Sequence, residues 1–311
     1  MNNANASKLA KKAQLKANLQ YLLMTVPGLI VLFIWHYLPM GGLVLAFEQY
    51  SYQKGIFGSK WVGFQHFENF FASKNFGILL RNTIGYNLGF MFLVNIGAGI
   101  VMALLLYEVK SKKAEKLYNT AMILPSFISI VIISYIVLMF LNPESGILNT
   151  FIKAFGGKEI EWYSHPKYWP AILLLVSIWK DAGMASLYFY SSLLNIDDSL
   201  FEACELDGAG RLKQIWYVSV PELMPMVVII IIMKMGSILG GDFGLFYQVP
   251  MDQAALYPAT DIFATYIYRG IANGTISQNA AVGMFQSVAG LVTILIANFT
   301  VKKIDPSKSL F

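Results

Sequence analysis

The chain has 311 residues, of which 56% are hydrophobic and only 13% charged, with a formal net charge of +5. Its mean hydropathy is +0.55. Because soluble domains contain roughly a quarter charged residues, this composition predicts a polytopic membrane protein. The one cysteine, Cys204, excludes an intrachain disulfide and a cysteine metal cluster. His36, His66 and His165 lack ligand-like spacing, so we expect no metal site. We also expect no nucleic-acid partner, because no basic face carries stacking aromatics.

Residues 1–19 form a polar, basic cytoplasmic tail. A long apolar run follows from Tyr21 to about Phe47, interrupted by Pro27 and His36. It is longer than the core of a signal peptide and lacks an obvious small-residue cleavage site, so we interpret it as a retained span. Residues 20–78 are therefore assigned to a first transmembrane helix and an outer loop.

Further apolar segments reach the ~20 residues that cross a bilayer core. They cover residues 83–107, 117–141, 169–193, 223–247 and 280–300. Helices satisfy every backbone polar group within lipid, so the sequence predicts an all-α membrane protein with six transmembrane helices.

Lysine and arginine favour the cytoplasmic side of a membrane. With the N-terminus inside, the inner segments are rich in these residues: Lys8, Lys11, Lys12, Lys16, Lys110, Lys112, Lys113, Lys116, Arg211, Lys213, Lys302, Lys303 and Lys308. The lysines and arginines of the outer loops are spread over much longer connections. The bias places the loop 194–222 and the tail 301–311 in the cytoplasm, so both termini are predicted to be cytoplasmic.

The most polar stretch between spans runs from Ser199 to Pro225. Ser199 and Glu202 have capping-box spacing, which predicts the start of a short helix. Gly208 and Gly210 would end that helix, and a second short helix would follow and stop at Pro221. On these grounds alone, a surface amphipathic loop is an equal alternative.

The spacing within this stretch resembles a known motif. Glu202-Ala203-Cys204 is followed by three residues, Gly208, nine residues and Val218-Ser-Val-Pro221. The sequence is similar to the Glu-Ala-Ala loop of membrane subunits in binding-protein-dependent ABC importers. It departs from that pattern at Cys204, Val218 and Val220, where the family has Ala, Ile and Leu. All three changes keep a small or apolar side chain.

Other blocks resemble one branch of that family, the permeases for polysaccharide-derived oligosaccharides named after a lipoprotein-cluster permease. They are His36-Tyr-Leu-Pro-Met-Gly41, Ala46-Phe47, Lys54-Gly-Ile-Phe-Gly-Ser59, Asp261-Ile-Phe-Ala-Thr-Tyr-Ile-Tyr-Arg269 and Ala281-Val-Gly-Met-Phe-Gln-Ser287. A further block, Trp179-Lys-Asp-Ala-Gly183, resembles a Trp-Lys-x-x-Gly feature of sugar-importer permeases. The similarity covers nearly the whole chain, from about Tyr21 to Lys303. The loop identifies the superfamily, and the blocks suggest the branch.

The resemblance implies a type I ABC importer permease in the cytoplasmic membrane of a bacterium, with its core at residues 79–300. The segment 199–220 would be the cytoplasmic coupling helix that docks on an ATPase. Its candidate coupling residues are Glu202, Ala203, Cys204, Glu205, Asp207, Gly208 and Pro221. Glu202 could pair with an arginine across that interface, or merely cap its own helix. The implied partners are a second homologous permease, two ATPase subunits, an extracytoplasmic sugar-binding protein, the carbohydrate and membrane lipid.

Several polar and aromatic residues within the spans are candidates for a translocation path: Trp179, Lys180, Asp181, Tyr188, Lys234, Asp242 and Tyr266. An ionisable side chain inside a membrane normally faces a cavity or a partner, and a sugar packs its C–H face on an aromatic ring. For the charged residues, structural ion pairs and snorkelling lysines are equally open interpretations. For the aromatic residues, ordinary packing or a place at the membrane interface is favoured. Lys180 and Asp181 are sequence neighbours, so we do not expect them to pair.

The chain lacks a Gly-x-x-x-x-Gly-Lys-Ser/Thr loop and a Gly-x-Ser-x-Gly elbow. We therefore expect no enzyme activity and no cofactor in this chain, with ATP and magnesium bound by the partner ATPase. Two alternatives are an ion-coupled secondary transporter, which predicts inverted repeats that are not evident, and a membrane-bound cell-envelope sugar enzyme. Glu144, Glu159 and Glu161 could serve such an enzyme, but they fit a solvated loop better.

Overall fold

A computed structural model describes residues 3–304, which are almost entirely helical. Residues 1–2 and 305–311, at the ends of the two expected cytoplasmic tails, lie outside the described residues. The α-helices are α1 (Asn3–Leu32), α2 (Gly55–Gly58), α3 (Gln65–Ala72), α4 (Lys74–Gly89), α5 (Gly99–Tyr107), α6 (Lys112–Ile123), α7 (Ile130–Leu141), α8 (Ile147–Ala154), α9 (Trp169–Leu193), α10 (Asp198–Leu206), α11 (Arg211–Gln214), α12 (Val220–Met235), α13 (Phe243–Gln248), α14 (Tyr257–Thr260), α15 (Phe263–Ala272) and α16 (Ile276–Ile304).

Shorter elements join or extend these helices. Wider π-helical turns are η1 (Phe33–Tyr37), η3 (Phe90–Ala98) and η7 (Ile215–Ser219). Tighter 3₁₀ segments are η2 (Leu38–Phe47), η4 (Leu124–Phe127), η5 (Trp162–Ser164), η6 (Pro166–Tyr168) and η8 (Ala254–Leu256). The strands β1 (Glu48–Gln49) and β2 (Lys60–Trp61) pair antiparallel.

Within residues 3–304, five continuous helices are long and apolar enough to cross a membrane: Asn18–Phe47, Lys74–Tyr107, Pro166–Leu193, Arg211–Met235 and Ile276–Lys303. A sixth span would be a bent pair, Lys112–Phe127 with Ile130–Leu141. The all-α membrane fold is therefore confirmed, and the expected six spans are reached when the bent pair counts as one.

The segment 117–141 is not the single straight helix that the sequence predicts. Its two halves meet at an angle of 94°. Pro125 lies in the 3₁₀ turn η4, and Ile128 after it has an extended backbone. Ser129 then starts α7 by accepting a hydrogen bond from the Val131 N–H at 3.3 Å. The proline and the new cap explain why the helix breaks here.

The predicted span 223–247 is also shifted. One helix runs from Arg211 to Met235, and a separate helix, α13, follows after a break. Pro221 does not stop the helix. It lies in the first turn of α12, directly after the wide π-helical turn η7, where a proline ring is tolerated. The polar loop is therefore shorter than 194–222 and spans 194–210.

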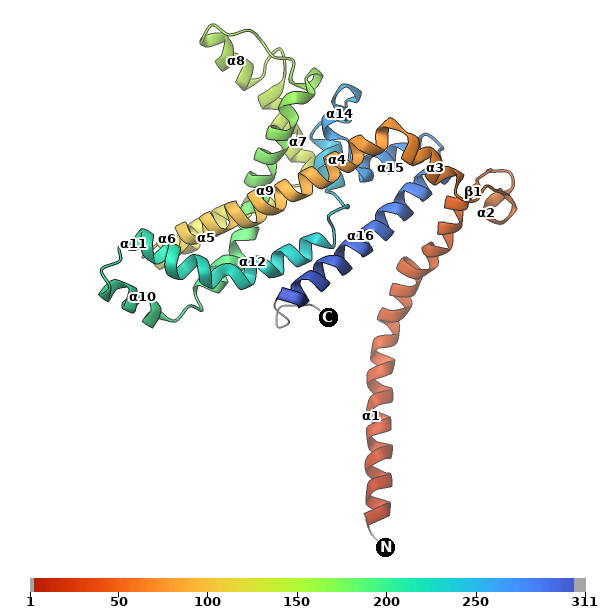
Figure 1. Cartoon of the computed structure of the whole chain (residues 1–311), viewed down its shortest axis with the longest axis horizontal. Coiled ribbons are helices and arrows are strands. Elements are labelled where there is room, and N and C mark those ends of the chain that lie inside the picture. The colour runs from red at the N-terminus through yellow and green to blue at the C-terminus, as the bar shows by residue number, and fades with distance from the viewer. Residues whose placement is uncertain (1–2, 305–311) are drawn as a thin grey trace.

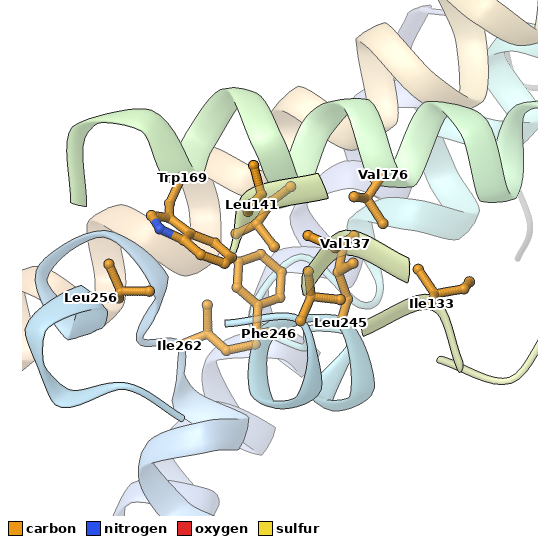
Figure 2. Close-up of a cluster of buried hydrophobic side chains, with 11 residues drawn as sticks. Ile133, Val137, Leu141, Trp169, Val176, Leu245, Phe246, Leu256 and Ile262 are labelled. Atoms are coloured by element: carbon orange, nitrogen blue, oxygen red, sulfur yellow. The ribbon is translucent and has the colours of Figure 1, made fainter. Parts of the chain in front are cut away.

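The buried core joins α4, α5, α9 and α12 with α7 and α13. One cluster packs Trp169 of α9 against Leu141 of α7 and Phe246 of α13 (Figure 2). A second cluster, around Phe189 and Leu223, holds α5, α9 and α12 together. By contrast, α1 extends away from this body (Figure 1). Only 6% of the apolar 18-residue window within the span Asn18–Phe47 is buried.

Candidate functional site

Helix α10 and the turn after it lie at one end of the bundle (Figure 1). The cap of α10 differs from the sequence expectation. Asp197, not Ser199, is the N-cap, and it accepts a hydrogen bond from the Ser199 N–H at 2.9 Å. Hydrogen bonds from the backbone and side chain of Ser199 hold the pKa of Asp197 below its ordinary value. The carboxylate of Glu202 is thus not required as a cap.

The C-terminal end of α10 confirms the role predicted for Gly208. Gly208 has a φ of +75°, a left-handed conformation that suits glycine. The Gly208 N–H donates to the Glu205 carbonyl at 2.9 Å, and the Ala209 N–H donates to the Cys204 carbonyl at 3.1 Å. These two bonds form a Schellman motif. Gly210 does not end α10 but is the N-cap of α11.

Arg211 ties the α10–α11 turn to the body of the protein. Its Nε donates to Glu108 at the end of α5 at 2.7 Å, and its Nη1 donates to Gln214 at 2.8 Å. The guanidinium also faces the rings of Tyr107 and Phe201, at 5.9 and 5.7 Å. Local sequence could not reveal this anchor, because Glu108 lies 103 positions earlier in the chain.

The surface of this turn combines exposed apolar and acidic side chains. Leu206 is 89% exposed, and Leu212, Trp216 and Tyr217 are also exposed. The candidate coupling residues at 202, 203, 205, 207 and 208 are exposed as well, and Cys204 is half-buried. Pro221 is exposed but lies further along, in α12. We call residues 197–217 the α10 knob, an element with a rigid attachment and an uncovered apolar surface.

A cavity of about 730 Å³ with both polar and apolar lining residues, here called the central cavity, lies among η3, α9 and α12. Four of the seven candidate path residues line it: Asp181, Tyr188, Lys234 and Asp242. The other lining residues include the amides of Asn87 and Asn95, the hydroxyls of Ser177 and Ser237, and several methionines. The cavity therefore offers hydrogen-bond donors and acceptors beside an apolar surface.

The charged groups of the central cavity are partly engaged within the protein. Lys180 and Asp181 do form an ion pair, with 3.0 Å between Nζ and Oδ1, which corrects the expectation that they would not. The long, flexible lysine side chain can fold back over its neighbour. Asp242 caps α13 by accepting a hydrogen bond from the Leu245 N–H at 3.0 Å. This hydrogen bond supports a structural role for Asp242.

Asn87 is a cavity residue that the sequence analysis missed. Its Nδ2 donates to the carbonyls of Ile238 and Gly240 at 3.0 and 3.2 Å, where the chain breaks after α12. An asparagine inside an apolar span was a signal that could have indicated this role, since buried polar groups need partners.

Trp179 and Tyr266 are not brought to the central cavity. The Trp179 side chain is 45% exposed and does not line the cavity. Tyr266 lines a separate cavity of about 510 Å³ and packs near Phe70, with 6.2 Å between ring centroids. The two residues therefore give no support to a path that includes all seven candidates.

The separate cavity beside Tyr266 is bordered by a charged network around Arg269. The guanidinium contacts Asp252 at 2.9 Å and Asp261 at 2.5 Å, and it lies 3.9 Å from the ring of Tyr257. Burial raises the pKa of Asp261, while the hydrogen bond from Thr265 and the charge of Arg269 act in the opposite direction. The block Asp261–Arg269 thus folds into one structural unit.

Comparisons with known proteins agree with this architecture. Residues 95–308 match the family described as "Binding-protein-dependent transport system inner membrane component". The chain is 34% identical to Protein LplB of Bacillus subtilis (strain 168), covering 94% of this chain and 92% of that one. It is also 34% identical to the polygalacturonan/rhamnogalacturonan transport system permease protein YteP of the same organism, over 90% and 87%.

Solved structures show the same fold. A chain of a bacterial ABC transporter involved in the import of the acidic polysaccharide alginate has a TM-score of 0.84 and 31% identity, covering 96% of this chain and 99% of that one. A bacterial alginate ABC transporter in complex with alginate pentasaccharide-bound periplasmic protein has a TM-score of 0.83 and 30% identity, over 94% and 97%. This chain belongs to the family of binding-protein-dependent transport system inner membrane components, the permease subunits of ABC importers.

Proposed function

We propose that this chain moves an oligosaccharide, derived from a polysaccharide, across the cytoplasmic membrane of a bacterium. Family membership makes it a transport subunit and not an enzyme, and it decides against the ion-coupled transporter and the cell-envelope enzyme. The saccharide substrate is supported by the similarity to YteP and to the alginate transporter. The chain's own contribution is the central cavity, which combines amides, hydroxyls and an exposed tyrosine ring.

The α10 knob is the observation that carries the coupling proposal. Its apolar side chains are exposed although they belong to a rigidly attached element, and exposed apolar patches mark interaction sites. In our proposal the knob docks on an ATPase subunit, with Glu202, Glu205 and Asp207 offering carboxylates to basic residues there. ATP and magnesium bind to that partner, and this chain binds neither.

The architecture and the relatives support a proposal for the remaining partners. The central cavity is only partly enclosed, and α1 projects from the body (Figure 1), so we propose a second, homologous permease that completes the path. Two ATPase subunits would serve the two permeases. An extracytoplasmic sugar-binding protein would deliver the substrate, in line with the complex of the alginate transporter with its periplasmic protein.

In this proposal the α10 knob and both termini are cytoplasmic, and the residues of α14 and α15 face outside. Residues 79–300 form the importer core, and residues 20–78 add the first helix and its outer loop. Closure of the ATPases would move the two knobs as rigid bodies. The spans would then open outward, and ATP hydrolysis would restore the inward-open state.

The test is uptake of a labelled oligosaccharide by the assembled complex in liposomes. We expect uptake to require ATP on the cytoplasmic side and saccharide-loaded binding protein outside, and to continue when ionophores abolish ion gradients. Uptake that ceases with the ionophores but needs no ATP would contradict the proposal.

A further inference from the structure

A third cavity, also of about 510 Å³ and here called the end groove, lies beside α14, at the end of the bundle opposite the α10 knob (Figure 1). It is formed by the C-terminal half of α4 and the start of η3, together with η6 and the N-terminal part of α9, and α14 lies along one side. Arg81 and Lys167 are its positively charged lining residues, and Tyr86 and Phe90 contribute aromatic rings. Apolar residues such as Leu174 form the part deeper along α9.

The end groove continues toward the central cavity. Phe90 lines both cavities. Helix α9 also contributes one face to both, because its lining positions recur every three or four residues. These positions are Pro170, Leu174, Ser177, Asp181, Met184 and Tyr188. A molecule that passes the end groove would therefore meet Phe90 and then the polar groups of the central cavity.

Arg81 is held in place by neutral oxygen atoms. Its Nη2 donates to the Pro258 carbonyl at 2.6 Å, and its Nε and Nη2 donate to the Asn82 Oδ1 at 3.2 and 3.0 Å. The Lys167 Nζ lies 4.7 Å from the ring centroid of Tyr168. Within residues 3–304, no ion pair includes Arg81 or Lys167. Both charges are thus positioned but not neutralised by a carboxylate.

Several other charged groups along the same route are compensated. Arg269, in the neighbouring cavity, contacts two carboxylates. In the central cavity, Asp181 pairs with Lys180, and Asp242 caps a helix. Within residues 3–304, Lys234 of the central cavity also makes no ion pair. The end groove, however, brings two such cations together, and this charge is complementary to an anion. A guanidinium binds a carboxylate through strong, charge-assisted hydrogen bonds.

We propose that the end groove is the outer mouth of the translocation path, and that Arg81 and Lys167 select saccharides that carry carboxylates, such as uronic acids. This inference rests on the proposed import function and adds the substrate class and the selecting residues. Arg81 and Lys167 bind the carboxylates, while Tyr86 and Phe90 contact the C–H faces of the sugar rings. An anionic lipid headgroup has a similar charge, so the test separates the two ligands.

The experiment uses the complete transporter in liposomes, at a saturating concentration of loaded binding protein. Uptake of an oligogalacturonate is compared with uptake of its carboxyl-reduced, neutral counterpart. Lys167→Gln is the cleanest variant, because Lys167 makes no hydrogen bond that holds the described fold. We expect about a fivefold lower rate for the acidic saccharide, the effect of one charge-assisted contact at an exposed site. The rate for the neutral saccharide should not change.

Two further variants sharpen the result. Arg81→Gln should lower uptake of the acidic saccharide more than Arg81→Lys, because lysine keeps the charge while both changes disturb the contacts with Asn82 and Pro258. Lys158→Gln is the matched control, since Lys158 is exposed on the loop before α9 and does not line the groove. It should leave both rates unchanged.

Three outcomes would overturn the inference. Import of the neutral saccharide by wild-type protein as fast as the acidic one would contradict carboxylate selection but leave the importer intact. Lys167→Gln and Arg81→Gln could lower both rates equally and lose co-purified phosphatidylglycerol, which would make the groove a lipid site. Failure of the wild type to import either saccharide would contradict the proposed function as well.

Discussion

At the scale of single residues, Gly183 shows how one position controls helix packing. A Cβ atom at Gly183 would lie 1.8 Å from the carbonyl oxygen of Met122, which real contacts never permit. The backbone of α6 therefore touches α9 at this point, directly beside the bend between α6 and α7. Gly183 closes the Trp179–Gly183 block of the sequence, so the glycine of this block is explained by helix packing.

We expect Gly183→Ala to destabilise the protein by about 1–3 kcal/mol, because an overpacked core must move its backbone. Thermal unfolding in detergent would measure the change. The control is Gly77→Ala in α4, where a Cβ meets no atom within 4 Å; it should be stabilising by about 0.5–1 kcal/mol, the usual difference in a helix. Equal unfolding temperatures for wild type and Gly183→Ala would contradict the contact.

The sequence was less informative about which residues contact one another. It identified Gly208 from its position after a short helix, because a left-handed turn has a local signature. The anchoring of Arg211 by Glu108, and of Arg269 by Asp252 and Asp261, depends on the tertiary fold. The prediction that Lys180 and Asp181 do not pair was wrong, because helix geometry alone ignores the reach of a lysine side chain.

At the scale of elements, apolar length predicted where helices occur, but not where they bend or end. The segment 117–141 has continuous hydrophobicity, yet Pro125 and the Ser129 cap divide it. Pro221 was read as a stop signal, and the helix passes through it because a π-helical turn precedes it. Proline thus broke one helix and was accommodated in another, according to the local turn.

The N-cap of α10 gives a prediction for this element. Asp197→Ala should remove the acceptor for the Ser199 N–H, so amide hydrogen exchange in the first turn of α10 should be several-fold faster than in the wild type. Ser199→Ala, at the position predicted by sequence but not used as the N-cap, should have the smaller effect. The opposite order would restore the capping box of Ser199 and Glu202.

The same cap has a defined pH dependence. Because the pKa of Asp197 is lowered in the folded state, its stabilising effect is present above the ordinary pKa of an aspartate and is lost as pH falls through the lowered value. Protection of the first turn should therefore be constant near neutral pH and decrease only in acid. Asp197→Asn, which keeps an acceptor oxygen without the titrating charge, should remove this pH dependence.

At the scale of the whole molecule, two surfaces remain uncovered at opposite ends of the path. The α10 knob presents exposed leucines and carboxylates, and the end groove presents Arg81 and Lys167. The central cavity lies between them, lined by four of the candidate residues. The sequence predicted the membrane fold and the knob, because hydropathy and the Glu-Ala-Ala spacing are local. It missed the end groove, whose lining residues come from three distant segments.

The most direct test of this account is co-purification with the partner ATPase. The variant combines Glu202→Arg with Leu206→Asp, two exposed positions on α10 whose change should not disturb the buried core. Glu144→Arg, exposed at the other end of the bundle, is the control for charge reversal. We predict that wild type and control retain the ATPase, while the double variant inserts in the membrane, folds and loses it. Retention of the ATPase by the double variant, with normal uptake, would contradict the assignment of the α10 knob as the coupling element.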